Sequence, residues 1–128
     1  MVSHLSLNLN FPPYLDGCVA AGGHFNPYDD DHGMPNATER HVGDLGNIVT
    51  PAGAGMATPV DKEDHFITLF DATEGIVGRT LVIHADPDDF MGASGNAGSR
   101  VACGIVELVD AKEALDMLPD NLKAQIYS

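Results

Sequence analysis

Three histidines and an aspartate lie close together in a stretch rich in glycine, proline and acidic residues. The stretch GGHFNPYDDDHGMPNATERHVGDLGN, residues 22–47, contains His24, His32, His41 and Asp44. Three imidazoles and one carboxylate can form a closed tetrahedral shell around Zn²⁺, which accepts nitrogen and oxygen donors and imposes no geometry of its own. A single loop histidine is most simply an unrelated surface residue, but four ligand-type residues in this compact pattern favour a zinc site.

The first half of this stretch is predicted to be a long loop. Glycine, proline, asparagine and aspartate punctuate residues 17–35 throughout. Loops of this length without their own secondary structure are uncommon in compact domains unless something organises them. A bound metal ion would do so.

Short apolar segments predict the strands that would hold this loop. Strict apolar and polar alternation in SLNLN predicts a half-buried strand, and β-branched residues favour others. The expected strands are residues 6–10, 41–49, 65–70, 78–84 and 101–109. Residues 51–59 and 86–99 are expected to be irregular connections.

The end of the chain has a different pattern. Residues 110–126 have apolar side chains at near-helical spacing, namely Ala114, Leu115, Leu118, Leu122 and Ile126. Proline is favoured in the first turn of a helix and disrupts a helix interior. We therefore predict two short helices, with Pro119 at the start of the second.

Composition limits the class of protein and its partners. A chain of 128 residues with Gly 14, Pro 8 and 6% aromatic residues predicts one loop-rich β domain. A formal net charge of −13 argues against nucleic acid or an anionic membrane as a partner. The sequence has neither a long apolar span nor the pattern of a secretion signal, so we expect a cytoplasmic protein. On composition alone, Cys18 and Cys103 are most simply two buried thiols.

Three segments together resemble the copper/zinc superoxide dismutases. HFNPYDDDHGMP followed by RHVGDLGN is similar to the zinc loop of that family. GNAGSRVACGIV, residues 95–106, resembles its arginine-and-cysteine signature, and GRTLVIHADPDD, residues 78–89, is similar to a strand that carries a copper ligand. The resemblance extends from about Phe11 to Val106. It implies an all-β, incomplete antiparallel Greek-key barrel over residues 1–109, with a helical tail over 110–128.

The resemblance also implies a role for individual residues. His24 would bridge copper and zinc, His84 would bind copper, and Arg100 would hold the superoxide anion beside the copper. His24 and Arg100 would be the catalytic residues. Asp88 would hydrogen-bond His32 and a copper-binding histidine, and thereby fix both rings. A disulfide would join Cys18 to Cys103, in place of the two thiols. The remaining zinc ligands would be His32, His41 and Asp44.

The copper site departs from the family pattern. Two further copper-binding histidines should form a His-x-His pair on the strand before the loop, and counting back from Cys18 places Leu7 and Leu9 there. His4 falls at a position that the family does not use to bind copper. The strands expected before this one are absent from the chain, which would leave unpaired edges. The chain is then either a divergent family member or a fragment joined to unrelated N-terminal residues.

We therefore expect dismutation of superoxide to oxygen and hydrogen peroxide to be weak or absent, with zinc bound and copper binding doubtful. The alternative is a non-catalytic, zinc-stabilised domain that binds a partner protein, such as a related subunit or a copper-delivery protein. Unpaired edges would favour a homodimer or a heterodimer.

Overall fold

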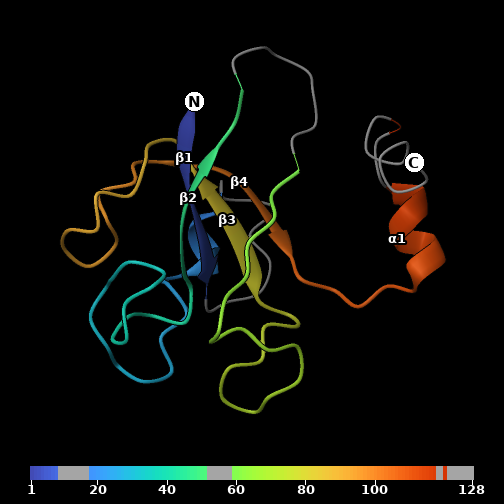
Figure 1. The fold of residues 1–128 in the computed structure, drawn as a ribbon, viewed down its shortest axis with the longest axis horizontal. Helices are drawn as coiled ribbons and strands as arrows, with labels where there is room; N and C mark the ends of the chain where they lie inside the picture. The colour runs from blue at the N-terminus through green and yellow to red at the C-terminus, as the bar shows by residue number, and fades with distance from the viewer. Residues whose placement is uncertain (9–17, 52–58, 118–119, 121–128) are drawn as a thin grey trace.

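Four antiparallel strands form the sheet that positions the candidate site (Figure 1). The computed structural model describes residues 1–8, 18–51, 59–117 and 120. The strands lie in the order β2-β1-β3-β4. Their bounds are β1 Val2–Asn8, β2 Asp44–Val49, β3 Thr80–His84 and β4 Arg100–Ile105. The predicted all-β antiparallel fold is confirmed, and within the described residues the sheet remains open instead of closing into a barrel.

Strand β1 is one of the two inner strands of the sheet, and its side chains alternate between the two faces. Successive side chains of a strand point to opposite faces. Leu5 and Leu7 pair with Ile83 and Leu81 of β3 and share the apolar face. The core on this side is formed by Leu5, Leu7, Phe25, Val42, Leu45 and Ile48. The alternate residues of β1, which are His4, Ser6 and Asn8, are all buried on the other face.

A bulge adjusts β2 where it passes the polar face of β1. Three residues of β1, from His4 to Ser6, lie opposite four of β2, from Asn47 to Asp44. Gly46 in the longer segment has φ +71°, a conformation that L side chains rarely adopt. Bulges bend a strand and redirect its side chains. This bulge shifts the pairing register with β1 by one residue between Asn47 and Asp44.

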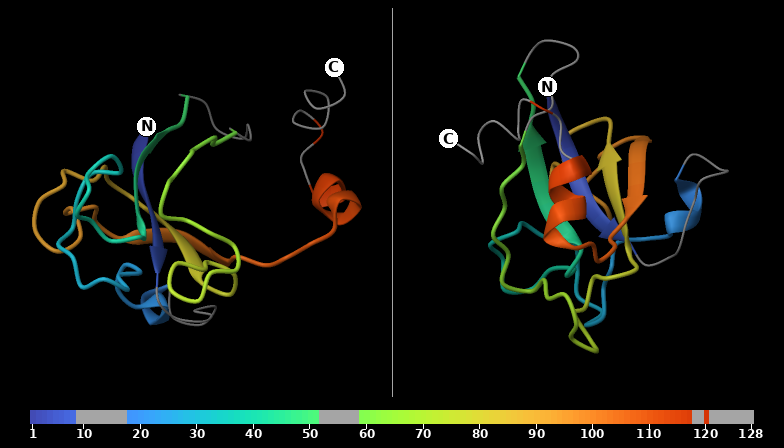
Figure 2. Two further views of the ribbon diagram at one scale, coloured as in Figure 1. Left: turned by 60° about the horizontal axis from the view of Figure 1, so that its bottom comes forward. Right: turned by 90° about the vertical axis from the view of Figure 1, so that its right-hand side faces the viewer.

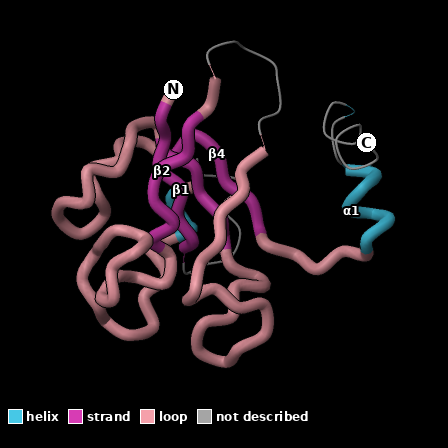
Figure 3. Tube along the Cα trace, viewed as in Figure 1, coloured by secondary structure: helices cyan, strands magenta, loops and turns pink. Residues whose placement is uncertain are grey.

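Long connections surround the strands (Figures 2 and 3). The loop after residue 18 contains one short 3₁₀ turn, η1 Val19–Ala21, before it reaches β2. The implied disulfide is present and joins Cys18 to Cys103 of β4, 85 residues away. It fixes the start of this loop to the edge strand of the sheet.

The secondary-structure predictions were partly correct. The first strand begins at Val2 instead of Ser6, and residues 9 and 10 lie outside the described part of the chain. The last strand ends at Ile105, so its predicted extension to Val109 is wrong.

The strand predicted over residues 65–70 is also wrong. This segment has only an isolated bridge between Thr68 and Gly75, followed by a turn in which the Asp71 carboxylate accepts the amides of Thr73 and Glu74. Phe66 packs against the Arg40 guanidinium, whose carbon lies 4.7 Å from the ring centre. Side-chain packing and local hydrogen bonds here replace strand pairing.

Helix α1 Ala111–Met117 confirms the first of the two predicted helices in the tail. Apart from Asp120, the second predicted helix lies outside the described residues. Figures 1 and 2 show α1 away from the four strands, at the end of the segment 106–110. In the part of the chain that is described, no helix has the length and apolar character needed to cross a membrane.

Candidate metal centre

Backbone hydrogen bonds place the loop histidines beside the sheet. The amide of Phe25 donates to the carbonyl of Leu7 at 2.8 Å, and the amide of Gly43 donates to the carbonyl of Phe25 at 2.9 Å. The amide of Leu7 in turn donates to the carbonyl of Gly43 at 3.0 Å. These three bonds hold His24 and Asp44, the neighbours of Phe25 and Gly43, close to β1.

A buried arginine fixes the approach to β2. Arg40 is 1% exposed, and one of its terminal nitrogens donates to the carbonyls of His41, Val42 and Asp44. The other forms two bonds of 2.6 and 2.7 Å with the carboxylate of Asp64. A buried charge is tolerated when it is paired and hydrogen-bonded in this way. The backbone that carries His41 and Asp44 is therefore held firmly.

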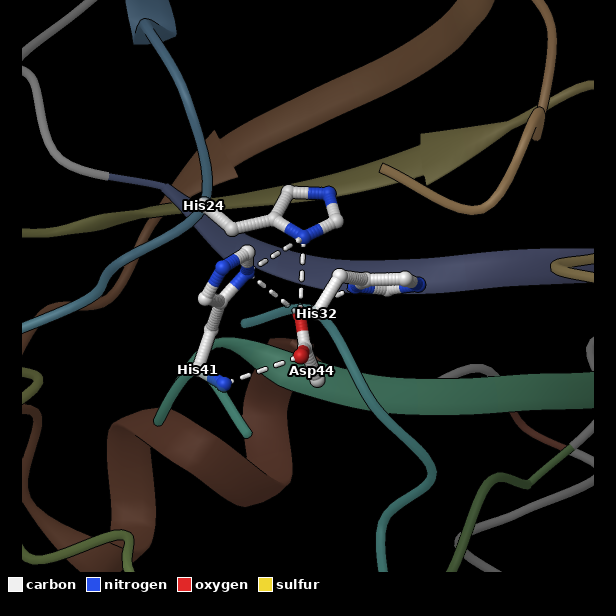
Figure 4. Close-up of side chains that lie close together, drawn as sticks. All are labelled: His24, His32, His41 and Asp44. Atoms are coloured by element: carbon white, nitrogen blue, oxygen red, sulfur yellow. Dashed lines mark hydrogen bonds and ion pairs between the residues drawn. The ribbon is translucent and has the colours of Figure 1, made fainter. Parts of the chain in front are cut away.

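The four residues predicted to bind zinc meet around one carboxylate oxygen (Figure 4). Oδ1 of Asp44 lies 2.8 Å from Nδ1 of His24. The same oxygen lies 3.0 Å from Nδ1 of His32 and 3.0 Å from Nδ1 of His41. The other oxygen, Oδ2, accepts the backbone amides of Gly33 and His41. Asp44 is thus oriented from both sides.

These distances fit a tetrahedral metal site. With bonds of 2.0–2.1 Å, the ligand atoms of a tetrahedral zinc ion lie about 3.3 Å apart. The Nδ1 atoms of His24 and His41 lie 3.4 Å apart, and the contacts to Asp44 are slightly shorter. Nδ1 of His32 is buried and has no hydrogen-bond partner among the described residues, although Asp44 is close. Such converging lone pairs suit a cation, and the donor set suits Zn²⁺.

Electrostatics favours a cation at this point as well. Burial alone would raise the pKa of Asp44, but the adjacent imidazoles of His24 and His32 and the amide of Gly33 hold it well below its ordinary value. Burial opposes charge on His32, yet Asp44 and Asp88 outweigh it and raise the pKa of His32 to about 9. Burial lowers the pKa of His41. The carboxylate is therefore ionised and surrounded by imidazoles, one of which carries charge when no metal is bound.

A second cluster of three buried imidazoles adjoins the first. The ligand atoms of His4, His24 and His84 all lie within 4.8 Å of one another. The ring centres of His4 and His84 are 5.2 Å apart, and those of His4 and His24 are 5.4 Å apart. Nε2 of His24 and both ring nitrogens of His4 are buried without hydrogen-bond partners among the described residues. His24 therefore faces one cluster with Nδ1, and its Nε2 remains available to the other.

The second cluster corrects the sequence-based interpretation of the copper ligands. Leu7 was predicted to occupy a copper-ligand position, but it is 1% exposed in the apolar core on the opposite face of β1. The residue that joins His24 and His84 is His4, and Ser6 lies next to them. Leu9 lies outside the described residues. Counting back from the cysteine failed because it assumed a fixed number of residues between β1 and the loop.

The surroundings of His84 leave Nε2 available to a metal. Nδ1 lies 3.3 Å from the carbonyl of Gly98, which can only accept, so Nδ1 carries the proton of the neutral ring. Nε2 faces the hydroxyl of Ser6 at 3.4 Å, but this hydroxyl makes a shorter bond of 2.8 Å to Oδ1 of Asn8. Burial lowers the pKa of His84 and, more strongly, that of His4, to about 4. Both rings are neutral at pH 7, as metal-binding imidazoles must be.

Asp88 lies between the two clusters. One carboxylate oxygen is 3.0 Å from Nε2 of His32, and the other is 3.3 Å from Nδ1 of His4. Two hydrogen bonds to Asn47 hold the Asp88 backbone. Gly95 closes this corner with φ +70°, and a Cβ there would overlap the Asp88 carboxylate and lie 2.8 Å from Nε2 of His32. Carboxylates in such positions orient metal-binding imidazoles.

Arg100 extends from β4 across the loop that follows the disulfide. Its guanidinium donates to the carbonyl of Cys18 at 2.7 Å and to that of Gly22 at 2.6 Å. Arg100 pairs with His84 across β3 and β4, and its charge contributes to the lowered pKa of His84. It is therefore a fixed positive charge beside the second cluster, in a chain with a net charge of −13.

Sequence reasoning thus found every residue of the first cluster and missed His4 and Ser6 in the second. The alternation of β1 contained the signal. Residues two apart on a strand point to the same face, so His4 and Ser6 form one polar pair and the leucines form the opposite face. Starting the strand at Val2 instead of Ser6 would have included them.

Comparisons with known proteins agree with this geometry. The family model described as copper/zinc superoxide dismutase matches residues 10–106. An extracellular superoxide dismutase [Cu-Zn] of Brugia pahangi is 48% identical over 103 residues, which cover 73% of this chain and 50% of the relative. The chain thus spans about half the length of that curated relative. A crystal structure of the clock protein EA4 is similar with a TM-score of 0.76 and 36% identity, over 85% of this chain and 71% of that one.

Proposed function

This chain belongs to the copper/zinc superoxide dismutase family, and from that premise we propose that it dismutes superoxide slowly, through a zinc-supported copper site with three imidazole ligands. The observation that carries the proposal is the buried set of His4, His24 and His84 next to the complete zinc-type cluster. Membership of the family implies both metals as cofactors.

The donors at the second cluster suit copper. Neutral imidazole binds Cu, Zn, Fe and Ni, so ligand number and geometry decide how well the site serves each metal. Bound copper would supply the one-electron exchange by which two superoxide anions and two protons give oxygen and hydrogen peroxide. His4, His24 and His84 would hold the ion. Ser6, where a fourth imidazole would complete the set, leaves that side to a hydroxyl.

The other residues would support the ion and attract the substrate. Zn²⁺ held by His24, His32, His41 and Asp44 would fix the orientation of His24. Asp88 would orient His4 and His32 together through its two oxygens. Arg100 would attract the superoxide anion, because its guanidinium is fixed by backbone carbonyls and offsets the negative field of the chain.

A second candidate is a non-catalytic, zinc-stabilised domain that binds a partner protein. One observation favours it: the zinc-type cluster has four donors, whereas the second cluster has three and a hydroxyl. With fewer ligands, copper would be held more weakly and its potential tuned less well. A related subunit or a copper-delivery protein would be a suitable partner, and the open edges of the sheet would allow a dimer.

The domain limits and the location are part of the same proposal. Residues 1–109 would form the metal-binding unit and 110–128 a helical appendix. The disulfide and the similarity to an extracellular superoxide dismutase suit a location outside the cytoplasm at least as well as the cytoplasmic one expected from the sequence.

A superoxide-decay assay tests the proposal. The protein is loaded with zinc and then with copper, and its activity is compared with that of Ser6→His, which adds a fourth imidazole on the same face of β1. Arg100→Ala is made in both backgrounds. We expect a low, copper-dependent activity in the original chain once unbound copper has been removed, a rise in Ser6→His, and a fall with Arg100→Ala in both.

Two outcomes would contradict it. If copper-loaded protein, freed of unbound copper, is no more active than the copper-free protein although copper is bound, the non-catalytic function is favoured. If Arg100→Ala leaves a substantial activity unchanged, the assigned role of Arg100 is wrong.

A further inference from the structure

The hydroxyl of Ser6 has one hydrogen, and its partner is defined. Ser6 is 0% exposed and lies on the same face of β1 as His4 and Asn8. Its Oγ donates to Oδ1 of Asn8 at 2.8 Å. A serine hydroxyl has a single hydrogen and two lone pairs, so it can still accept bonds when it donates one. The lone pairs of Ser6 are therefore turned away from Asn8.

The side-chain amide of Asn8 can face Ser6 only with its oxygen. Its Nδ2 donates to the carbonyl of Gly22 at 2.8 Å, and the same carbonyl accepts Nη2 of Arg100 at 2.6 Å. A carbonyl oxygen has no hydrogen to donate, so the amide nitrogen must face Gly22 and the amide oxygen must face Ser6. Asn8 is 0% exposed, which shields these bonds from bulk water. Asn8 thus fixes the direction in which Ser6 donates.

His84 presents another lone pair to Ser6. Nε2 of His84 lies 3.4 Å from Oγ of Ser6. Because Nδ1 of His84 faces the carbonyl of Gly98, Nδ1 carries the proton of the neutral ring and Nε2 is an acceptor. With the hydroxyl hydrogen directed at Asn8, two acceptor atoms face each other without a hydrogen between them. Ser6 is 0% and His84 6% exposed, so this arrangement is unfavourable unless a cation lies between the two atoms.

The separation of the two acceptors suits a shared metal ion. With bonds of about 2.0–2.1 Å, the donor atoms of a tetrahedral site lie about 3.3 Å apart. The 3.4 Å between Oγ of Ser6 and Nε2 of His84 is close to this value. His84 is also one of the three imidazoles of the second cluster, whose ligand atoms lie within 4.8 Å of one another. The hydroxyl oxygen of Ser6 therefore adjoins the donors of that cluster.

We propose that the hydroxyl oxygen of Ser6 is the fourth donor of the second cluster, and that Asn8 is the positioning residue that turns the hydroxyl hydrogen away from the metal. This assignment rests on the proposed copper site and specifies its ligands as three imidazole nitrogens and one neutral oxygen. Without Asn8, the hydroxyl would donate to Nε2 of His84 and occupy the lone pair that copper needs. Because oxygen is a harder donor than imidazole, this set favours Cu(II) over Cu(I).

A thiol at position 6 tests whether this side chain reaches the metal. Zinc-loaded Ser6→Cys is titrated with Co²⁺, whose thiolate complexes have an intense charge-transfer band in the near ultraviolet. Ser3→Cys is the matched control, because Ser3 is buried on the opposite face of β1. We expect the band in Ser6→Cys and not in Ser3→Cys. An equal band in both variants, or no band in Ser6→Cys with one Co²⁺ bound, would overturn the proposal.

The hydroxyl itself is tested with Ser6→Ala, which removes the oxygen and little volume. Competition with chelators measures the affinity for Cu(II) and Cu(I), and electron paramagnetic resonance reports the Cu(II) ligands. We expect the Cu(II) affinity to fall on the order of tenfold, the Cu(I) affinity to change less, and the copper hyperfine splitting to change. Ser3→Ala should alter none of these. An unchanged Cu(II) spectrum and affinity in Ser6→Ala would show that the hydroxyl is not a ligand.

A double-mutant cycle separates positioning by Asn8 from support of the fold. Asn8→Leu removes the acceptor of the Ser6 hydroxyl and has a side chain of similar size. We expect it to lower the Cu(II) affinity about tenfold in the original chain and to have no further effect in Ser6→Ala, where no hydroxyl remains to be oriented. Equal losses in both backgrounds would overturn the role of Asn8. These readouts need no superoxide, so a lack of dismutation would contradict the proposed activity and leave the ligand assignment standing.

Discussion

The two imidazole clusters share His24 but are constructed in different ways. The zinc-type cluster takes its ligands from one loop and the start of β2, and its three imidazole donors surround a single oxygen of Asp44, which is the fourth donor. The second cluster takes His4 from β1, His24 from the loop and His84 from β3, and it has a hydroxyl where a fourth imidazole would fit. The first is complete within a local segment, whereas the second depends on how the strands pair.

This difference shows where each metal site is vulnerable. Removing one ligand from the complete cluster would weaken metal binding and leave the remaining buried ligands without the cation that compensates them. The second cluster already lacks a fourth imidazole, so adding a histidine tests its copper binding as well as removing one does. Asp88, which contacts His32 and His4, is the main link between the two besides His24.

The largest effect is expected from Asp44→Ala. This change removes the one anionic donor of the zinc-type cluster and the acceptor of the amides of Gly33 and His41. We expect loss of zinc binding and a decrease of about 3–5 kcal/mol in the free energy of unfolding, as for broken buried ion pairs. Calorimetry and hydrogen exchange across residues 18–47 measure both, and a chelator should give the same exchange pattern.

Asp31→Ala is the control, because Asp31 is an exposed acidic residue in the same loop. It should leave zinc content and exchange unchanged. Unaltered exchange in the loop after verified zinc removal would show that the metal does not order it.

Reduction of the disulfide should have the next largest effect. Cys18 and Cys103 close a loop with a sequence separation of 85, for which the chain-entropy model gives a stabilisation of about 3–5 kcal/mol. We expect a clear fall in melting temperature on adding reductant. The variant Cys18→Ser/Cys103→Ser should melt at the lower temperature whether or not reductant is present. If reductant shifts this variant as well, the effect does not come from the disulfide.

Replacing residues of β1 distinguishes its two faces. Ser6→His should raise copper affinity by on the order of tenfold or more, because a fourth imidazole joins the three already there. Leu7→His should not, since its side chain would enter the apolar core and destabilise the protein. Copper titration of zinc-loaded protein measures both. A gain in copper affinity with Leu7→His would support the sequence-based assignment of Leu7 to a copper-ligand position.

An effect of similar size is expected at the link between the clusters. A Cβ on Gly95 would displace the Asp88 carboxylate from His32, so Gly95→Ala should weaken zinc binding by about 10–100-fold, the usual loss when an orienting partner is removed. Gly92→Ala is the matched control, because Gly92 has a similar φ of +65° with no neighbour within 4 Å. Equal losses in the two variants would point to backbone strain instead of displacement of Asp88.

The same contrast between the clusters explains how much the sequence predicted. His24, His32, His41 and Asp44 lie close together in the chain, so their pattern was visible without any knowledge of pairing. His4 and His84 are adjacent only through the register of β1 and β3, which one sequence does not specify.

The strand predictions have the same physical limit. Alternating residues located part of β1, and β-branched residues located β3. Residues 65–70 have similar propensity, yet tertiary contacts such as Phe66 against Arg40 determine their conformation. Local patterns therefore found the loop site and most of the strands, while long-range contacts set the rest.

Copper binding to zinc-loaded His4→Ala tests the central claim most directly. His65→Ala is the control, because His65 is exposed and belongs to neither cluster. The account predicts that the original chain and His65→Ala bind one copper ion each, and that His4→Ala keeps its zinc but loses copper affinity by on the order of tenfold or more. Unchanged copper affinity in His4→Ala would contradict the three-imidazole site.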